Sequence, residues 1–169
     1  MRRIATLLAL FIVCMVNSQA FKGKGDIKAQ VGASLQSGGT GLFISSDIGL
    51  GENISIGAAV NYLLSANTQQ VYGLTIEEPK FVDKFDLKAR FNANIGNVFK
   101  LDPKMDIYPG LDLGLRNLGL HAGFRYFFTD GFGVFGEAGV PIASYNDKNS
   151  LYSKYNNQFT FNVGASFNL

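Results

Sequence analysis

Residues able to do acid–base chemistry are few in this sequence, and the clearest candidates are its one histidine, His121, and the acid Glu137. A histidine that acts as a general base needs a nucleophile within reach of its ring. Barrel-shaped lipid deacylases carry that nucleophile, a serine, two residues after the histidine, where this chain has Gly123. We therefore predict that the protein is not an enzyme and that it uses no cofactor and no metal.

Two short motifs match known patterns without the structural context that gives those patterns meaning. Gly131-x-Gly133-x-x-Gly136 has the spacing of a dinucleotide-binding loop, which requires a following helix whose N-terminus holds the pyrophosphate. Strand-like alternation continues here through Val140 instead. Asn53-Ile54-Ser55 fits a glycosylation acceptor but falls in a predicted tight turn. Neither motif predicts a functional site.

The N-terminus predicts export from the cytoplasm. Two arginines precede an apolar run over residues 4–16, and Ser18 and Ala20 supply the small residues of a signal-peptidase site. The run is shorter than the roughly 20 residues that a membrane-spanning helix needs. We predict a signal peptide over residues 1–20, cleaved near Ala20, and a single domain over residues 21–169.

Removal of this leader also changes the balance of charge. The whole chain has 15 basic and 13 acidic residues, and the loss of Arg2 and Arg3 leaves 13 of each. An even balance without a basic patch argues against a nucleic-acid partner. The one cysteine, Cys14, leaves with the leader, so we expect neither disulfides nor cysteine metal sites in the mature protein.

The last twelve residues carry the clearest structural signal. A strand at the end of a chain needs a partner on each edge, and a closed antiparallel barrel supplies both. We predict that this segment closes an all-β, eight-stranded antiparallel up-and-down transmembrane β-barrel. Its apolar residues recur at every second position, which is the period of a strand with one apolar face, and they are Phe159, Phe161, Val163, Ala165, Phe167 and Leu169.

Seven further alternating segments precede the closing strand. Each is long enough for a tilted strand that crosses a bilayer, which takes about 9 to 11 residues. Pro109 interrupts the fifth segment, and we expect a β-bulge there because proline lacks a ladder donor. The segments cover residues 26–36, 42–50, 54–64, 84–95, 106–116, 120–128 and 132–142.

An even number of strands places both termini on the periplasmic side of an outer membrane. The short connections at residues 52–53, 96–104 and 129–131 then become periplasmic turns. The longer segments 65–81 and 144–157, which show no regular period, become extracellular loops.

Glycine decides which face of the barrel is outside. Most strand glycines, such as Gly57 and Gly123, fall on the polar face, whereas Gly136 falls on the apolar face. An eight-stranded barrel has room inside only for small or closely packed side chains, so the polar face points inward. This argues against the alternative of a soluble, lipocalin-like barrel with an apolar interior. Outward aromatic residues also form two girdles, Tyr62, Phe85 and Phe159 at one end and Tyr126, Phe128, Phe132 and Phe167 at the other.

The chain resembles the small eight-stranded outer-membrane barrels of the OmpA and OmpX kind, and more closely the uncharacterised single-domain barrels of outer membranes. The likeness is carried by the segments DIGLGENISIG, FDLKARFNANIGN, YPGLDLGL, GFRYFFTDGFGVFGEAGVPIA and FNVGASFNL. It implies a monomer that contacts outer-membrane lipid in a Gram-negative-type cell and is inserted by the barrel-assembly machinery. Such barrels usually end in an aromatic residue, whereas this chain ends in Leu169, two residues after Phe167.

Charged residues on the inward face are predicted to pair within the lumen. If Phe128 and Val134 face each other across their hairpin, Arg125 lies opposite Glu137, and we expect these two to pair even after a slip of one pair, which leaves them diagonal. A paired network of this kind fills a narrow barrel instead of forming an ion path. The ion-pair candidates are Arg125, Glu137, Arg90, Asp112, Lys88 and Asp86, and the other inward charges are Asp26, Asp47, Asp106, Lys28, Lys84 and Arg116.

The two long loops are free to carry function because the scaffold residues face lipid or fill the lumen. Tyrosine offers contact area at low entropic cost, so the candidates for surface binding are Tyr72, Tyr145, Tyr152 and Tyr155. We predict a closed barrel with a structural role, or one that binds an extracellular ligand through loops 65–81 and 144–157. The alternative is a narrow channel or transporter for small or apolar solutes.

Overall fold

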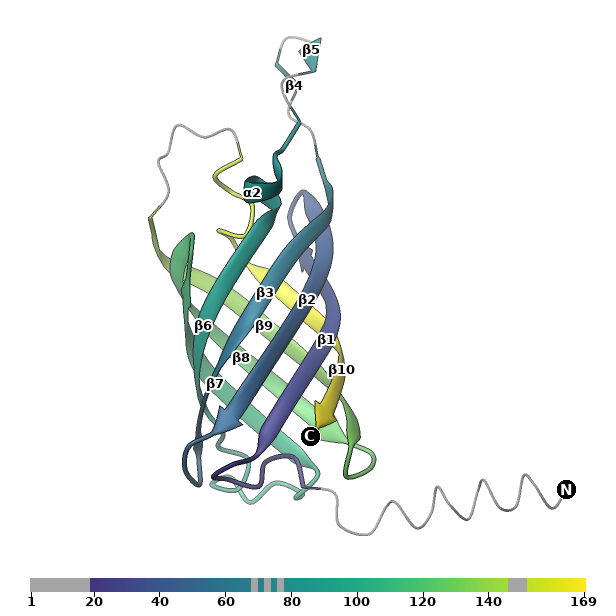
Figure 1. Cartoon of the computed structure of the whole chain (residues 1–169), viewed down its shortest axis with the longest axis vertical. Helices are drawn as coiled ribbons and strands as arrows, with labels where there is room; N and C mark the ends of the chain where they lie inside the picture. The colour runs from purple at the N-terminus through teal and green to yellow at the C-terminus, as the bar shows by residue number, and fades with distance from the viewer. Residues whose placement is uncertain (1–18, 68–69, 72–73, 76–77, 146–151) are drawn as a thin grey trace, which may run out of the picture.

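The protein folds into one closed antiparallel barrel (Figure 1). The structure is a computed structural model that describes residues 19–67, 70–71, 74–75, 78–145 and 152–169, so most of the predicted signal peptide and Tyr72 lie outside the described residues. The barrel strands are β1 (Ile27–Gln36), β2 (Gly39–Gly49), β3 (Ile54–Ala66), β6 (Phe85–Ala93), β7 (Met105–Gly114), β8 (Asn117–Phe127), β9 (Phe132–Ser144) and β10 (Thr160–Asn168). All eight predicted strands are confirmed.

The C-terminal strand closes the barrel as its alternation predicts. β10 pairs with β9 on one edge and with β1 on the other. The β1 ladder runs from Lys28 opposite Asn168 to Gln36 opposite Thr160. The amide of Leu169 extends it by donating to the carbonyl of Ile27 at 3.0 Å. No edge of the sheet is left open, which removes the hazard of an unpaired strand.

The segment 65–81 contains more structure than the sequence predicts. Strand β3 continues into it as far as Ala66, and two short strands, β4 (Gln70–Val71) and β5 (Leu74–Thr75), form a hairpin that projects beyond the barrel end (Figure 1). The four-residue helix α2 (Phe81–Lys84) then leads into β6, and the carboxylate of Asp83 accepts a hydrogen bond from the amide of Lys80. Elements this short are invisible to a periodicity argument, which needs several turns or alternations.

The predicted β-bulge at Pro109 is wrong. Pro109 faces Ala122 in an unbroken β7–β8 register, and the shifts in register fall between Thr40 and Gly41 and between Leu118 and Gly119. The β6–β7 ladder instead stops at Asn92 opposite Gly110. The amide of Ile95 donates to the carbonyl of Ile107, and hydrogen-bonded positions alternate along an antiparallel pair of strands. Residue 109 is therefore a position whose N–H would point at β6, and proline has no N–H. Proline therefore interrupts one ladder without bending the strand.

The polar face lies inside the barrel and the apolar face outside, as the glycine positions predict. Inward residues such as Gln30, Asn61 and Asp86 are fully buried, whereas outward residues such as Ile44 and Leu113 are exposed. Gly123 shows why the inward face needs glycine. A Cβ atom there would lie 2.1 Å from the ring of Tyr108. The core of this barrel is thus a packed polar lumen.

Outward aromatic rings form contacting clusters at both barrel ends. At the end near α2, Phe81 lies 5.4 Å from both Tyr62 and Phe85 between ring centroids. At the other end, Phe132 is 5.8 Å from Phe167 and 6.1 Å from Phe128, which also contacts Tyr126. The sequence missed Phe81 because it falls within a segment predicted to be irregular.

Across the described part of the chain, none of the helices has the length and apolar character needed to span a membrane.

Candidate functional site: the polar lumen and its two ends

The middle of the lumen is held by Arg90, which lies directly opposite Asp112 across the β6–β7 ladder. Its Nη2 donates to Glu137 Oε2 at 2.5 Å, and its Nε lies 3.5 Å from Asp112 Oδ1. Lys88 reaches the same Asp112 at 3.6 Å. Because β7 and β8 lie between β6 and β9 around the barrel, the bond from Arg90 to Glu137 does not follow a ladder but crosses the lumen between non-adjacent strands.

His121 belongs to this central cluster. Its Nδ1 lies 2.9 Å from Asp112 Oδ1, and its Nε2 lies 2.7 Å from Asn92 Oδ1. Its side chain is completely buried, and it faces the lumen as predicted. His121 and Glu137 have different polar partners, since Glu137 contacts Arg90 and Asn162. Within the described part of the chain, no group of three or more His, Cys, Asp or Glu residues could hold a metal ion.

A second layer lies nearer the end that carries the chain termini. Arg125 faces Asp106 across β7–β8, and its Nε and Nη2 both donate to Asp106 Oδ2, at 3.1 and 2.9 Å. Its Nη2 also contacts Asn94 Oδ1, and its guanidinium lies 4.3 Å from the ring centre of Tyr108. This charge is satisfied on several sides, which is what burial of a guanidinium requires.

The predicted pair between Arg125 and Glu137 is wrong. The hairpin register places Arg125 opposite Phe135 and Glu137 opposite Gly123, which is two residues, or one pair, away from the predicted register. The two residues are therefore diagonal neighbours, and we expected them to pair even then. Each has a better-placed partner: Asp106 directly faces Arg125 on the neighbouring strand, and Arg90 reaches Glu137 from across the barrel.

The remaining inward charges are distributed toward the two ends of the lumen. Lys28 binds Asp26 at 2.6 Å and Asn168 at 2.8 Å near the chain termini. Asp86 accepts a hydrogen bond from the amide of Leu115 near the opposite end. Arg116 donates to two backbone carbonyls, those of Val82 in α2 and of Phe85 at the start of β6.

The prediction for Lys84 is wrong. This lysine lies in helix α2 and is only half-buried, so it does not face the lumen. The sequence placed it at the start of a strand because it continues the alternation of residues 84–95 backwards by one position. Helix α2 ends there instead, and the strand begins at Phe85.

Apolar side chains also fill part of the lumen, and they are harder to identify from the sequence than the charged residues are. The rings of Phe43 and Phe135 lie 5.6 Å apart inside the barrel, and Arg90 lies 5.6 Å from the ring centre of Phe43. The sequence predicts the inward position of Phe135 but does not single out Phe43. The sequence did offer a signal, because Phe43 is four positions before the inward residue Asp47 on the same strand and must therefore point to the same side.

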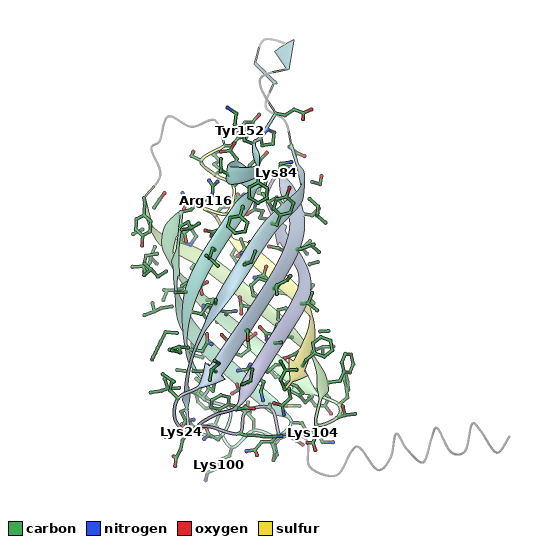
Figure 2. All side chains as sticks on the ribbon, in the orientation of Figure 1. Lys24, Lys84, Lys100, Lys104, Arg116 and Tyr152 are labelled. Carbon is green, nitrogen blue, oxygen red and sulfur yellow. The ribbon has the colours of Figure 1, made fainter. Side chains whose placement is uncertain are left out.

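The end of the lumen near α2 is covered by residues 152–158. The rings of Tyr152 and Tyr155 stack at 5.5 Å and pack on the inward side chain of Leu63. Asn156, whose φ of 55° suits asparagine, ties the segment down. Its amide donates to Gln36, its side-chain amide donates to the carbonyl of Lys84, and its carbonyl accepts from Asn117. Figure 2 shows Tyr152 at this end together with Lys84 and Arg116.

Two of the predicted loop-binding tyrosines therefore have a different place. Tyr152 and Tyr155 are buried beneath the loop surface, and Tyr155 donates to the carbonyl of Asn67. Burial raises the pKa of the Tyr155 hydroxyl, which keeps it protonated as a donor. Tyr145 is 54% exposed and stays available, and Tyr72 lies outside the described residues. The composition of the loop predicts contact area but not that the contact is intramolecular.

The opposite end is crossed by the N-terminal segment 19–26. The amide of Ala20 donates to the carbonyl of Pro103 at 2.7 Å, and that of Gly25 donates to the carbonyl of Gly49 at 2.8 Å. A pocket of about 270 Å³ remains between this segment and the turn 96–104, with the side chains of Asn94 and Asp106 at its inner wall. Protein atoms thus cover both ends of the lumen.

Some buried polar atoms in the lumen have no protein partner. Both carboxylate oxygens of Asp47, one oxygen of Asp86 and the side-chain oxygen of Asn61 are among them. Buried polar groups in this state are usually satisfied by ordered water. The lumen is therefore a charge-paired interior with sites for water between its layers.

Comparisons with known proteins find similar structures and one matching family. Two solved structures share the arrangement, both at a TM-score of 0.49. One, "De novo design of transmembrane beta-barrels", is 8% identical and covers 88% of this chain and 98% of its own. The other, "Solution NMR structure of de novo designed TMB2.3", is 14% identical and covers 88% of this chain and 97% of its own. No curated protein sequence matches the chain significantly. The model of one family, the family of unknown function DUF6646, matches residues 11–169, and the protein therefore belongs to that family.

Proposed function

We propose that the protein is a monomeric outer-membrane barrel of a Gram-negative-type cell, exported by a signal peptide that is cleaved near Ala20 and inserted by the barrel-assembly machinery. Its role is that of a closed membrane-spanning scaffold that presents surface loops, as in the small barrels of the OmpA and OmpX kind. It has no catalytic activity of its own.

The apolar outer wall supports membrane insertion. Leu, Ile, Val and Phe side chains that are 40% or more exposed recur on every barrel strand, for example Ile44, Ile56 and Val163. Contiguous apolar surface of this extent is rare on soluble monomers. The aromatic clusters at the two ends match the girdles that flank the apolar band of such barrels.

The single observation that carries the closed-scaffold proposal is the bond from Arg90 to Glu137 across the middle of the lumen. A solute path along the axis would have to break this buried pair. The Arg125 layer, the Phe43 and Phe135 rings and the covers at both ends lie on the same path.

Surface binding is assigned to the segment 65–81 together with Tyr145. The β4–β5 hairpin projects beyond the barrel (Figure 1), and Phe81 and Val82 on α2 are more than 60% exposed. The part of the loop 144–157 that folds over the lumen, residues 152–157, serves the barrel instead. The ligand is an extracellular partner whose chemistry the sequence does not specify.

The test begins with the mature chain, residues 21–169, refolded in detergent and run on a gel before and after boiling. Closed barrels resist cold detergent, so we expect a compact band that shifts on boiling. A chain that stays soluble and monomeric without detergent would overturn the membrane proposal.

Replacement of residues 67–78 by a short Gly/Ser turn then tests the surface role. The barrel should stay folded and heat-modifiable while binding to the cell's extracellular partner is lost. A cellular phenotype that survives this replacement would assign the function to the wall or the lumen.

The alternative function is a narrow channel or transporter. The observation in its favour is the set of buried polar atoms that need water, such as those of Asp47 and Asn61. Water between the layers is not a continuous path, and the conductance measurement described in the Discussion separates the two proposals.

A further inference from the structure

We propose that the outer wall carries a binding site for one glycerophospholipid with an anionic headgroup, from the leaflet on the side of the chain termini. The site is a groove across strands β6 to β9 whose end lies beside the turn 96–104. This inference rests on the proposed membrane insertion, and the juxtaposition that carries it is that of the apolar groove with a turn that exposes Val98 and Phe99 and carries two lysines, Lys100 and Lys104, against one acid, Asp102.

The strand register forms the floor of the groove. Pro109 faces Ala122 across β7–β8, Ala122 faces Ala138 across β8–β9, and the same phase brings Ala93 beside Pro109. Four small outward residues therefore form one row over four adjacent strands. At about 4.8 Å between strands, this row is about 14 Å long.

Larger side chains form the two sides of the groove. Phe91, Leu111, Leu120 and Val140 make the row on the side of α2. On the other side the register places Ile107 opposite Phe124. The groove is shallow and open on its outer side, and its volume is about 590 Å³, within the range of about 300 to 1,000 Å³ that ligand sites occupy.

The chemistry of the groove suits a hydrocarbon chain. The outward residues that line it carry no charge and no hydrogen-bonding side chain, and the one polar residue of the lining, His121, faces the lumen and is bonded to Asn92. A hydrocarbon chain gains about 0.8 kcal/mol per buried methylene from water, but in a bilayer the gain is one of close packing, which a concave floor improves. The closed sheet curves away on both sides of the groove, so a flexible chain follows its floor better than a second barrel.

The turn 96–104 supplies the headgroup end. It begins three residues after Ala93, the groove residue on β6, and the amide of Phe99 donates to the carbonyl of Ile95, which folds the turn back on the end of that strand. Val98 and Phe99 are 63% and 64% exposed, and Lys100 follows them with its side chain exposed. Figure 2 shows Lys100 and Lys104 at this end of the barrel. Apolar residues beside lysines are the composition of an interfacial lipid anchor.

The groove is tested by native mass spectrometry of the refolded mature chain, after its heat-modifiability is verified, with equimolar phosphatidylglycerol and phosphatidylcholine of the same acyl chains. We expect one retained phosphatidylglycerol per barrel. The double variant Ala122→Leu with Ala138→Leu fills the groove and should abolish retention of the lipid. The matched control, Ala58→Leu with Ala89→Leu, adds the same volume to the outer wall elsewhere and should retain the lipid.

The headgroup end is tested separately. Lys100→Gln with Lys104→Gln should lower the preference for phosphatidylglycerol by about fivefold per lysine, whereas Lys154→Gln at the opposite end should not change it. Equal lipid retention by the wild type and the groove-filled variant would overturn the proposal. So would a dimer that only groove filling disperses, because it would assign the groove to a second copy of the chain. A chain that is not heat-modifiable would instead refute membrane insertion, on which the site depends.

Discussion

At the scale of single residues, most buried charges in the lumen of this barrel have a partner of opposite charge, and Asp47, whose two carboxylate oxygens have no protein partner, is an exception. Arg90, Glu137 and Asp112 are almost completely buried, and each has an oppositely charged group within 3.5 Å. Desolvation of such a pair is costly, so its net contribution to folding is small. Loss of one partner is a different matter, because the other charge then stays buried alone.

The substitution Glu137→Ala should therefore reduce the free energy of unfolding by roughly 3 to 5 kcal/mol. The measurement is the urea midpoint of the barrel refolded in lipid vesicles. Asp130→Ala, which removes an exposed acid in the hairpin turn, is the matched control and should leave the midpoint in place. The double variant Arg90→Met with Glu137→Leu should recover most of the loss. An unaltered midpoint for Glu137→Ala would contradict the pairing.

A second residue-scale prediction concerns the two kinds of glycine. Gly123→Ala would place Cβ 2.1 Å from the ring of Tyr108, so we expect a loss of about 1 to 3 kcal/mol from overpacking. Gly136→Ala is the control, because its Cβ would point outward with its nearest neighbour, Phe161 Cζ, 3.7 Å away. The measurement is the thermal unfolding midpoint. A similar change in the midpoint for both variants would mean that the Tyr108 ring moves aside without cost and would contradict the prediction.

At the scale of elements, the ladders differ in how completely they are bonded. Pro109 removes a donor from the β6–β7 ladder, which extends only from Lys88 opposite Gly114 to Asn92 opposite Gly110. The neighbouring β7–β8 ladder passes Pro109 without a shift. Among the long strands, β6 and β7 thus form the pair with the fewest ladder positions.

The substitution Pro109→Ala should restore a hydrogen bond between β6 and β7. It returns an N–H that points at the carbonyl of Ala93, and one added hydrogen bond contributes about 1 kcal/mol. We expect a higher urea midpoint and slower amide exchange at Ala93 and Ile95, with exchange in β1 unchanged. A lower midpoint would show that the rigid ring of Pro109 stabilises the wall more than a ladder bond does.

At the scale of the whole molecule, closure is redundant. The segment 152–158 covers one end, the segment 21–26 of the mature chain lies at the other, and two charged layers and a pair of rings lie between them. Removal of one of these barriers leaves the others in place. The barrel should therefore behave as a sealed scaffold even when an end is disturbed.

Planar bilayer recordings test this directly. The wild type should show no steady single-channel conductance, and Tyr152→Ala with Tyr155→Ala, which uncovers one end, should be equally silent because the pair of Arg90 and Glu137 stays intact. Steady conductance in the wild type would favour the channel. Conductance only in the tyrosine variant would make residues 152–158 the sole barrier.

Much of this architecture follows from the sequence alone. Alternation of period two defines all eight long strands, and the concentration of glycine on one face shows that this face is inside, because only an interior forbids bulk. Both are local properties, since each residue's side is set by its position along its own strand. For the same reason the inward direction of Arg90, His121 and Glu137 could be predicted without coordinates.

The partners of those residues could not be predicted in this way. The pairing of Arg125 with Asp106 depends on a difference of one pair in hairpin register, and that of Arg90 with Glu137 depends on which strands face each other after closure. The burial of Tyr152 and Tyr155 likewise depends on where a loop of irregular sequence meets Leu63. The groove at Ala93, Pro109, Ala122 and Ala138 exists only because four separate strands align. Side-chain direction is a one-strand property that the sequence determines, whereas contact is a property of several strands at once and is decided by the tertiary structure.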